Sequence, residues 1–180
     1  MNLREQLKDI LLKKSVITGR EFKLSSGKIS NFYVDARITT LDPAGAYCCG
    51  KIFLEMLNDF NVDAVGGYSI GADPIVTSIA VLSYMDGHPI PAFIIRKEEK
   101  THGTGKMIEG NFPKEGGRVA IFDDVVTSGG SILKGAAQVE KQGGKVDVIM
   151  SVIDREEGGR EELEAAGYKF LSIFTKKDLM

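Results

Sequence analysis

The chain has 180 residues, of which 43% are hydrophobic and 27% are charged, and its formal net charge is −2 at pH 7. This balance is typical of a single soluble globular domain, and it argues against general nucleic-acid binding, which needs a basic surface. No apolar run approaches the roughly 20 residues that span a bilayer, so we expect no membrane segment. The only cysteines are the neighbours Cys48 and Cys49. Adjacent cysteines rarely bridge each other, so we expect no disulfide and a reducing, cytoplasmic location.

The first half of the chain has clear helix and strand signals. Charged residues alternate with leucines over 2–14, which predicts an amphipathic helix and not a signal peptide. Residues 22–38 are typical of strands with a turn at 25–27. Asp42 as N-cap and Pro43 at the first helical position predict a helix to about residue 59. A strand follows over 62–68, and Asp73-Pro74 begins a helix that runs to about Met85.

The second half continues the alternation after one long interruption. A strand is predicted over 91–95, but residues 97–116 are polar and glycine-rich without periodicity. A loop of this length is uncommon in a compact domain and is usually functional. Further strands are predicted over 118–123, 145–153 and 168–174. Helices are predicted over 130–142, where Gly143-Gly144 closes the helix, and over 161–166.

Strands that alternate with helices predict βαβ units, and hence an α/β fold with a mostly parallel sheet flanked by helices. The strands are almost entirely apolar, as expected when helices cover both faces. We expect one domain over residues 1–180. Ligands of such sheets bind beyond the carboxyl ends of the strands. Four segments should therefore border a common site: 68–73, 96–106, 123–131 and 154–159.

The segment 123–131 places two carboxylates before a turn rich in hydroxyls and glycine. The turn joins a strand to a helix N-terminus, so its N–H groups and the helix dipole suit a phosphate monoester. It is neither a Walker loop nor a dinucleotide turn. Carboxylates repel phosphate but accept hydrogen bonds from hydroxyls, so a phosphate next to a diol, as in ribose 5-phosphate, would satisfy both halves. A single aspartate could merely cap the turn, but two favour a ligand.

The other strand ends give weaker signals. The segment 96–106, which we call the flap, has four lysine or arginine residues and two glutamates, so its net charge is +2 before His102 titrates. A mobile cationic flap suits a polyanion whose charge grows during reaction, although a solvated charged loop has the same composition. Arg155 could bind a ligand carboxylate or pair with a neighbouring glutamate. The segment 68–73 could present N–H groups to a second phosphate, as could any plain turn.

Several of these segments resemble one enzyme family. The run hydrophobic–Asp-Asp–Val-Val-Thr-Ser-Gly-Gly-Ser resembles the phosphoribosyl pyrophosphate (PRPP) motif of the type I phosphoribosyltransferases. The flap pattern Arg-Lys-Glu-x-Lys-x-His-Gly resembles that of the orotate phosphoribosyltransferases, as do residues 22–27, 33–37 and 154–159. The matches occur in family order over nearly the whole chain. The resemblance implies transfer of the phosphoribosyl group from PRPP to orotate, giving orotidine 5′-monophosphate in pyrimidine biosynthesis.

The resemblance also implies roles for individual residues. Asp123 and Asp124 would hold the ribose hydroxyls, and with Lys100 and His102 they would be the catalytic residues. Orotate would contact Thr127 and Arg155, whose guanidinium would face the carboxylate. The implied PRPP-binding set consists of Arg96, Lys97, Lys100, His102, Asp123, Asp124, Val125, Val126, Thr127, Ser128, Gly129, Gly130 and Ser131.

Further implications concern cofactor and assembly. Mg²⁺ would be held mainly by PRPP and not by protein ligands. Residues 1–40 would form most of a small hood, and 97–116 a flexible catalytic loop that reaches the neighbouring subunit's site, so a homodimer with shared sites is implied. The chain departs from many members at Ser25, where they have lysine, and it has no lysine in 68–73, where some have one. The alternatives are a purine phosphoribosyltransferase and a regulator that binds PRPP without catalysis.

Overall fold

The computed structural model describes residues 2–23, 29–98 and 107–180. Its main sheet has six strands in the order β5-β4-β3-β6-β7-β8, and only β5 runs antiparallel to its neighbour. The predicted α/β fold with a mostly parallel sheet is therefore confirmed. The strands are β3 (Ala64–Tyr68), β4 (Ala92–Ile95), β5 (Ile108–Gly110), β6 (Arg118–Val126), β7 (Lys145–Asp154) and β8 (Phe170–Thr175).

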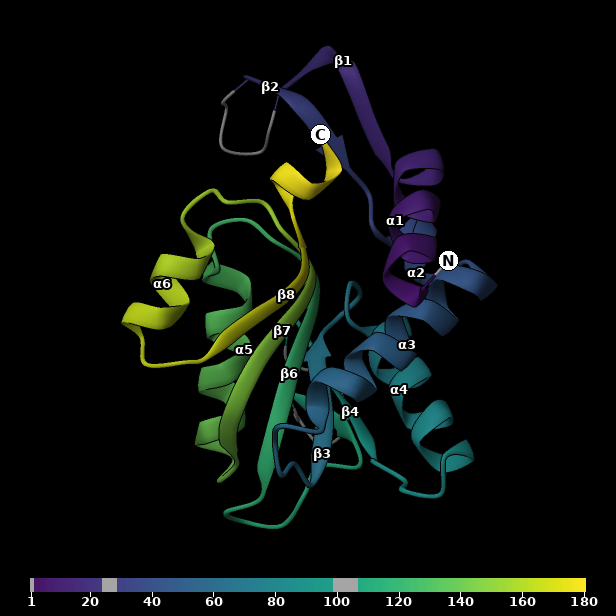
Figure 1. Ribbon diagram of the computed structural model, residues 1–180. Coiled ribbons are helices and arrows are strands. Elements are labelled where there is room, and N and C mark those ends of the chain that lie inside the picture. Colours follow the sequence, from purple (N-terminus) through teal and green to yellow (C-terminus); the bar gives the residue numbers. More distant parts are fainter. Residues whose placement is uncertain (1, 24–28, 99–106) are drawn as a thin grey trace.

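Helices cover both faces of this sheet (Figure 1). Alternate residues of β6 point to opposite faces, so Phe122 belongs to one apolar cluster and Ile121 to the other. The first cluster includes Leu7 and Phe53 from the helices on its side, and the second includes Val139. The helices on the first side are α1 (Leu3–Lys14), α2 (Arg37–Thr40), α3 (Pro43–Leu57) and α4 (Asp73–Met85). Those on the second side are α5 (Gly130–Lys141) and α6 (Gly159–Ala165).

The predicted start of α3 is confirmed in detail. The Asp42 side chain accepts hydrogen bonds from the N–H groups of Ala44 and Gly45, and Pro43 occupies the first turn, where no N–H is needed. Both cysteines lie buried in this helix as free thiols. Among the described residues no helix is long and apolar enough to cross a membrane.

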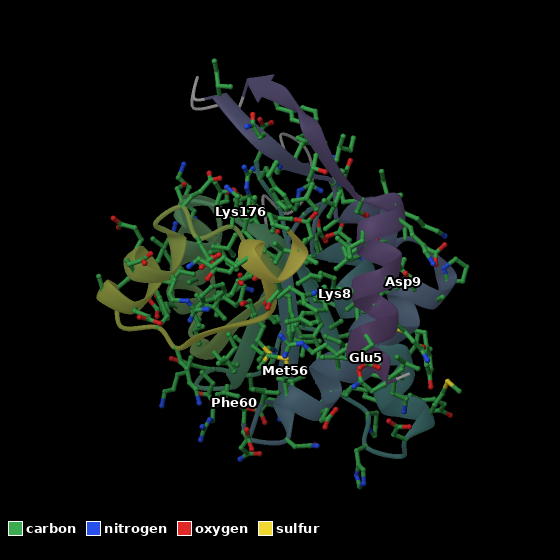
Figure 2. The ribbon with its side chains drawn as sticks, turned by 45° about the horizontal axis from the view of Figure 1, so that its top comes forward. Glu5, Lys8, Asp9, Met56, Phe60 and Lys176 are labelled. Carbon is green, nitrogen blue, oxygen red and sulfur yellow. The ribbon has the colours of Figure 1, made fainter. Side chains whose placement is uncertain are left out.

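An antiparallel hairpin, β1 (Val16–Lys23) and β2 (Ile29–Val34), forms a separate sheet. It stands over the carboxyl ends of the main strands (Figure 1). The final turn, η1 (Lys176–Leu179), reaches back toward it and carries Lys176, which is labelled in Figure 2. The Lys176 ammonium lies 5.7 Å from the centroid of the Phe32 ring. The hairpin is thus held close to the end of the sheet where ligands are expected.

Four details differ from the sequence-based expectation. β1 begins at residue 16 and not near 22, and an irregular register between Thr18 and Phe22 hides its alternation. The four-residue helix α2 lies where strand was expected, and β5 lies inside 97–116. β6 continues to residue 126 because its pairing with β7 continues, so Asp124 lies on the strand and not after it, and Asp123 is not the last strand residue.

Candidate active site

The strand order reverses between β3 and β6, because β4 follows β3 on one side and β6 pairs on the other. Such a switch point leaves a crevice beyond the carboxyl ends of the two strands. A cavity of about 290 Å³ lies at this position. It is lined by seven residues that the sequence predicts for substrate binding: Lys97, Asp123, Asp124, Val125, Thr127, Ser131 and Arg155.

A second, smaller cavity of about 90 Å³ adjoins it and is enclosed by the turn Thr127–Ser131. Gly129 adopts φ +77°, a left-handed conformation that favours glycine, and directly precedes α5. The turn therefore presents its N–H groups and hydroxyls at a helix N-terminus. Its size and donors suit one phosphate group. The predicted residues Val126, Ser128, Gly129 and Gly130 line this second cavity.

The same turn touches the first residue of α6, Gly159, backbone against backbone. A Cβ on Gly159 would lie 2.6 Å from the Thr127 carbonyl oxygen, and a Cβ on Gly129 would lie 3.1 Å from the Gly159 carbonyl oxygen. The Arg155 N–H also donates to the Val126 carbonyl at 2.9 Å. Only glycines allow so close an approach, which brings the segment around Arg155 against the phosphate-sized cavity.

Asp123 and Asp124 form an acidic pair at the centre of the larger cavity. Burial raises the pKa of both carboxyls, and for Asp123 the charge of Asp124 raises it further. Lys97 opposes the shift at Asp123, and Arg37 opposes it at Asp124. Each carboxylate accepts one backbone hydrogen bond, from the N–H of Asp124 at 2.9 Å and of Val125 at 2.8 Å. The pair is therefore suited to accept hydrogen bonds from ligand hydroxyls and to attract a cation.

The loop after β3 packs directly against these carboxylates. A Cβ on Gly71 would lie 2.5 Å from Oδ1 of Asp124 and 2.9 Å from Oδ1 of Asp123, so only glycine leaves the carboxylates in place. Ser69 donates a hydrogen bond to Asp73 at 2.8 Å, which fixes its hydroxyl at the cavity wall. The loop supplies polar groups and close backbone but no positive side chain.

Arg155 lies at the carboxyl end of β7 and is only 8% exposed. One terminal nitrogen of Arg155 donates to Glu157 at 2.8 Å, so the ion pair with a neighbouring glutamate, one of the two alternatives predicted from the sequence, does form. Its Nε, however, is buried without a hydrogen-bond partner in the part of the chain that the structure describes. Buried donors without a partner are rare in native proteins, so this one points to an acceptor on a ligand.

The remaining predicted residues lie elsewhere. Arg96 is outside the lining of both cavities and forms an ion pair with Glu109 of β5 at 3.8 Å. Lys100 and His102, together with Ser25 and the rest of the 25–27 turn, lie outside the described residues.

Asp35 and Arg37, to which the sequence assigns no role, line the larger cavity from the N-terminal segment. Their carboxylate and guanidinium form a two-point ion pair, with N–O distances of 2.9 Å and 3.0 Å. The available signal was the resemblance of residues 33–37 to the orotate phosphoribosyltransferases, which assigns no role to either side chain. That pattern alone does not place the pair at a site, because the site is completed only by tertiary packing.

Comparisons with known proteins identify the family. An orotate phosphoribosyltransferase of Aquifex aeolicus (strain VF5) is 45% identical over 179 residues, which is 98% of this chain and 97% of that protein. The chain belongs to the orotate phosphoribosyltransferase family. The crystal structure of Mycobacterium tuberculosis H37Rv orotate phosphoribosyltransferase in complex with PRPP is 33% identical, covers 99% of both chains and has a TM-score of 0.83.

The same fold is seen in a more distant neighbour. An adenine phosphoribosyltransferase from Thermoanaerobacter pseudethanolicus has a TM-score of 0.67 at 21% identity, over 95% of this chain and 98% of that one, and so shares the fold alone. No family model matches the chain.

Proposed function

We propose that the chain transfers the 5-phosphoribosyl group from PRPP to orotate, giving orotidine 5′-monophosphate and pyrophosphate in pyrimidine biosynthesis. One observation supports this above the others. A phosphate-sized cavity, an acidic pair and Arg155, whose Nε has no partner among the described residues, lie next to one another at the switch point of a chain that belongs to this family. These groups match, in order, a sugar phosphate, a diol and a carboxylate.

The chemistry follows from these positions. A C–N bond forms between a nitrogen of orotate and the anomeric carbon, while the C–O bond to pyrophosphate breaks, and the nitrogen's proton is lost. Positive charge grows on the sugar as the leaving group departs. The carboxylates of Asp123 and Asp124, which we assign to the ribose hydroxyls, would stabilise that charge. Thr127 and Arg155 would hold orotate, and the turn Thr127–Ser131 would hold the 5-phosphate.

Mg²⁺ fits this arrangement. Asp123 and Asp124 lie together at the cavity, yet the described residues contain no cluster of three or more side chains that could hold a metal. We therefore propose that the ion is held mainly by PRPP oxygens, where it would neutralise the charge developing on pyrophosphate.

We also propose a homodimer with shared sites. In addition to the flap pattern, an exposed apolar face supports it. Val81, Tyr84 and Met85 are exposed along one side of α4 at helical spacing. Ile38 is also exposed on α2, and Leu41 directly after it. Exposed apolar side chains at helical spacing are typical of protein interfaces. A second copy of the chain is the occupant that the shared-site arrangement requires.

The dimer is tested by charge substitution on this face. Tyr84→Asp combined with Met85→Asp is expected to halve the mass measured by analytical ultracentrifugation, whereas Leu12→Asp on α1, exposed outside the face, leaves it unchanged. An unchanged mass for the double variant would remove α4 from the interface.

We also propose that the β1–β2 hairpin forms the hood and that residues 97–116 form the flexible loop. α1 also lies within 1–40 but packs into the core.

The activity is tested by the loss of orotate absorbance with PRPP and Mg²⁺. Hypoxanthine, adenine and uracil serve as control bases. Turnover of a purine without turnover of orotate would favour the purine alternative, and PRPP binding without turnover of any base would favour the regulator. The presence of Arg155 argues against a purine substrate, because a purine base has no carboxylate for the guanidinium to bind.

A further inference from the structure

Arg37 is a positively charged side chain that lines the active-site cavity, and the roles proposed above do not include it. Asp35 accepts two hydrogen bonds from its Nε and Nη2, at 2.9 Å and 3.0 Å, and a third from its backbone N–H at 3.2 Å. This grip fixes the plane of the guanidinium. A guanidinium has five N–H donors, and Asp35 uses two of them. The described residues provide no hydrogen-bond acceptor for the other three.

The charge of Arg37 acts on the reaction centre. Its guanidinium lowers the pKa of Asp124, and the Asp124 charge in turn raises the pKa of Arg37, after the larger effect of Asp35. Arg37 lines the same cavity as Asp124 and Lys97. Its side chain is 43% exposed, so a ligand can reach the free donors.

The position of Arg37 in the fold indicates which part of the substrate it faces. β6, with the acidic pair and the phosphate-binding turn, lies between β3 and β7 in the sheet. Arg155 comes from the β7 side. Arg37 begins α2, which packs against α3 and α4 on the β3 side (Figure 1). An in-line displacement puts the nucleophile and the leaving group on opposite sides of the reacting carbon. If the base lies toward Arg155, the pyrophosphate lies toward Arg37.

We propose that Arg37, held by Asp35, binds the pyrophosphate group of PRPP within the same subunit. This inference rests on the proposed function. The loop after β3 contains no cation, so the N-terminal segment supplies one where the leaving group accumulates charge. A planar guanidinium with free donors suits this task because it can form two parallel hydrogen bonds to phosphate oxygens.

The test compares ligands that contain or lack the pyrophosphate group. Dissociation constants for PRPP, pyrophosphate and ribose 5-phosphate are measured by calorimetry with Mg²⁺ for the wild type and for Arg37→Gln. Loss of charge-assisted hydrogen bonds predicts roughly 10- to 100-fold weaker binding of PRPP and of pyrophosphate. Binding of ribose 5-phosphate is expected to change by less than about twofold.

Arg118→Gln is the matched control. Arg118 forms a similar side-chain pair with Asp147, at 2.7 Å and 2.5 Å, and is 49% exposed, but it lies at the amino end of β6, away from the cavity. It is expected to leave all three constants unchanged. Arg37→Lys keeps the charge without the fork and is expected to give an intermediate loss. If Arg37→Gln does not fold, the dissociation constants of Arg37→Lys are compared with those of the wild type instead.

Equal binding of PRPP by wild type and Arg37→Gln would overturn the proposal, because Arg37 would then be only a surface ion pair. Equal weakening of ribose 5-phosphate and PRPP would also overturn it, because Arg37 would then act through Asp124 on the ribose. A wild type that binds PRPP and pyrophosphate but does not convert orotate would refute the proposed function while leaving the Arg37 measurement valid. A wild type that binds no PRPP would refute both.

Discussion

Two arginines that follow β7 are expected to differ sharply when replaced by methionine. Arg155 is 8% exposed, donates to Glu157 and has an Nε without a partner in the described part of the chain. Arg160 donates to Asp154 at 3.0 Å, to the Phe170 carbonyl at 3.2 Å, and covers the Phe170 ring at 4.8 Å. The first is arranged for a ligand and the second for the fold.

For Arg155→Met the expected loss is in orotate binding. A hydrogen-bonded charge pair between guanidinium and carboxylate contributes about 1.5–3 kcal/mol, so the KM for orotate is expected to rise roughly 10- to 100-fold. Stability is expected to change little. Loss of the ion pair to the partly exposed Glu157 costs about 1 kcal/mol at most, and removal of a buried, partnerless donor offsets it by a similar amount.

For Arg160→Met the loss is in stability. Asp154 is 2% exposed in its side chain and, among the described residues, would retain only the hydrogen bond from the Glu156 N–H. A buried charge left without its partner costs about 3 kcal/mol, the lower end of the usual range, because Arg160 is itself partly exposed. In a chain of this size the melting temperature should fall by roughly 6–12 °C. The KM for orotate should stay near the wild-type value.

The assay combines initial rates at varied orotate with thermal unfolding followed by circular dichroism. The reasoning is refuted if Arg155→Met melts 6 °C or more below wild type, or if it binds orotate normally. It is also refuted if Arg160→Met raises the KM for orotate while leaving the melting temperature unchanged.

Three further expectations concern the acidic pair. Asp123→Asn should impair turnover yet have a higher melting temperature than wild type at pH 8, and this difference should shrink toward pH 4. The folded-state pKa of Asp123 is raised, so the wild type loses stability as the pH rises through that pKa, whereas the neutral asparagine does not. A difference in melting temperature that does not depend on pH would contradict this. Gly71→Ala, which crowds Oδ1 of Asp124, should weaken PRPP about tenfold in calorimetry, and unchanged affinity would argue against that crowding. Lys100→Ala mixed equally with Asp124→Asn should recover about a quarter of wild-type activity if sites are shared; no recovery after confirmed subunit exchange would place flap and carboxylates in one chain.

Local signals in the sequence predict much of this structure. Asp42-Pro43 and Asp73-Pro74 mark two helix starts within a residue of their observed positions, because each signal lies in neighbouring residues alone. Asp42 caps α3, whereas Asp73 is the first residue of α4 and forms no side-chain cap. The phosphate-sized turn is equally local, since its strand, glycines and helix are consecutive. The two carboxylates at its start were placed in the site for the same reason.

Other features depend on contacts that no short pattern contains. Asp35 and Arg37 reach the cavity only because the hairpin packs over the end of the sheet. α2 is four residues long, too short to show a helical period, and β6 extends to residue 126 through pairing with β7. The assignments of Lys100 and His102 remain predictions, because both lie outside the described residues.

The backbone contact between Gly129 and Gly159 couples the binding of the two substrates. Turns that touch without side chains between them have little freedom to move separately. A ligand that orders the phosphate turn therefore also orders the segment bearing Arg155. The second ligand then binds without the loss of conformational entropy that ordering this segment requires. We expect PRPP to tighten the binding of orotate. By thermodynamic reciprocity, orotate must then tighten the binding of PRPP by the same factor.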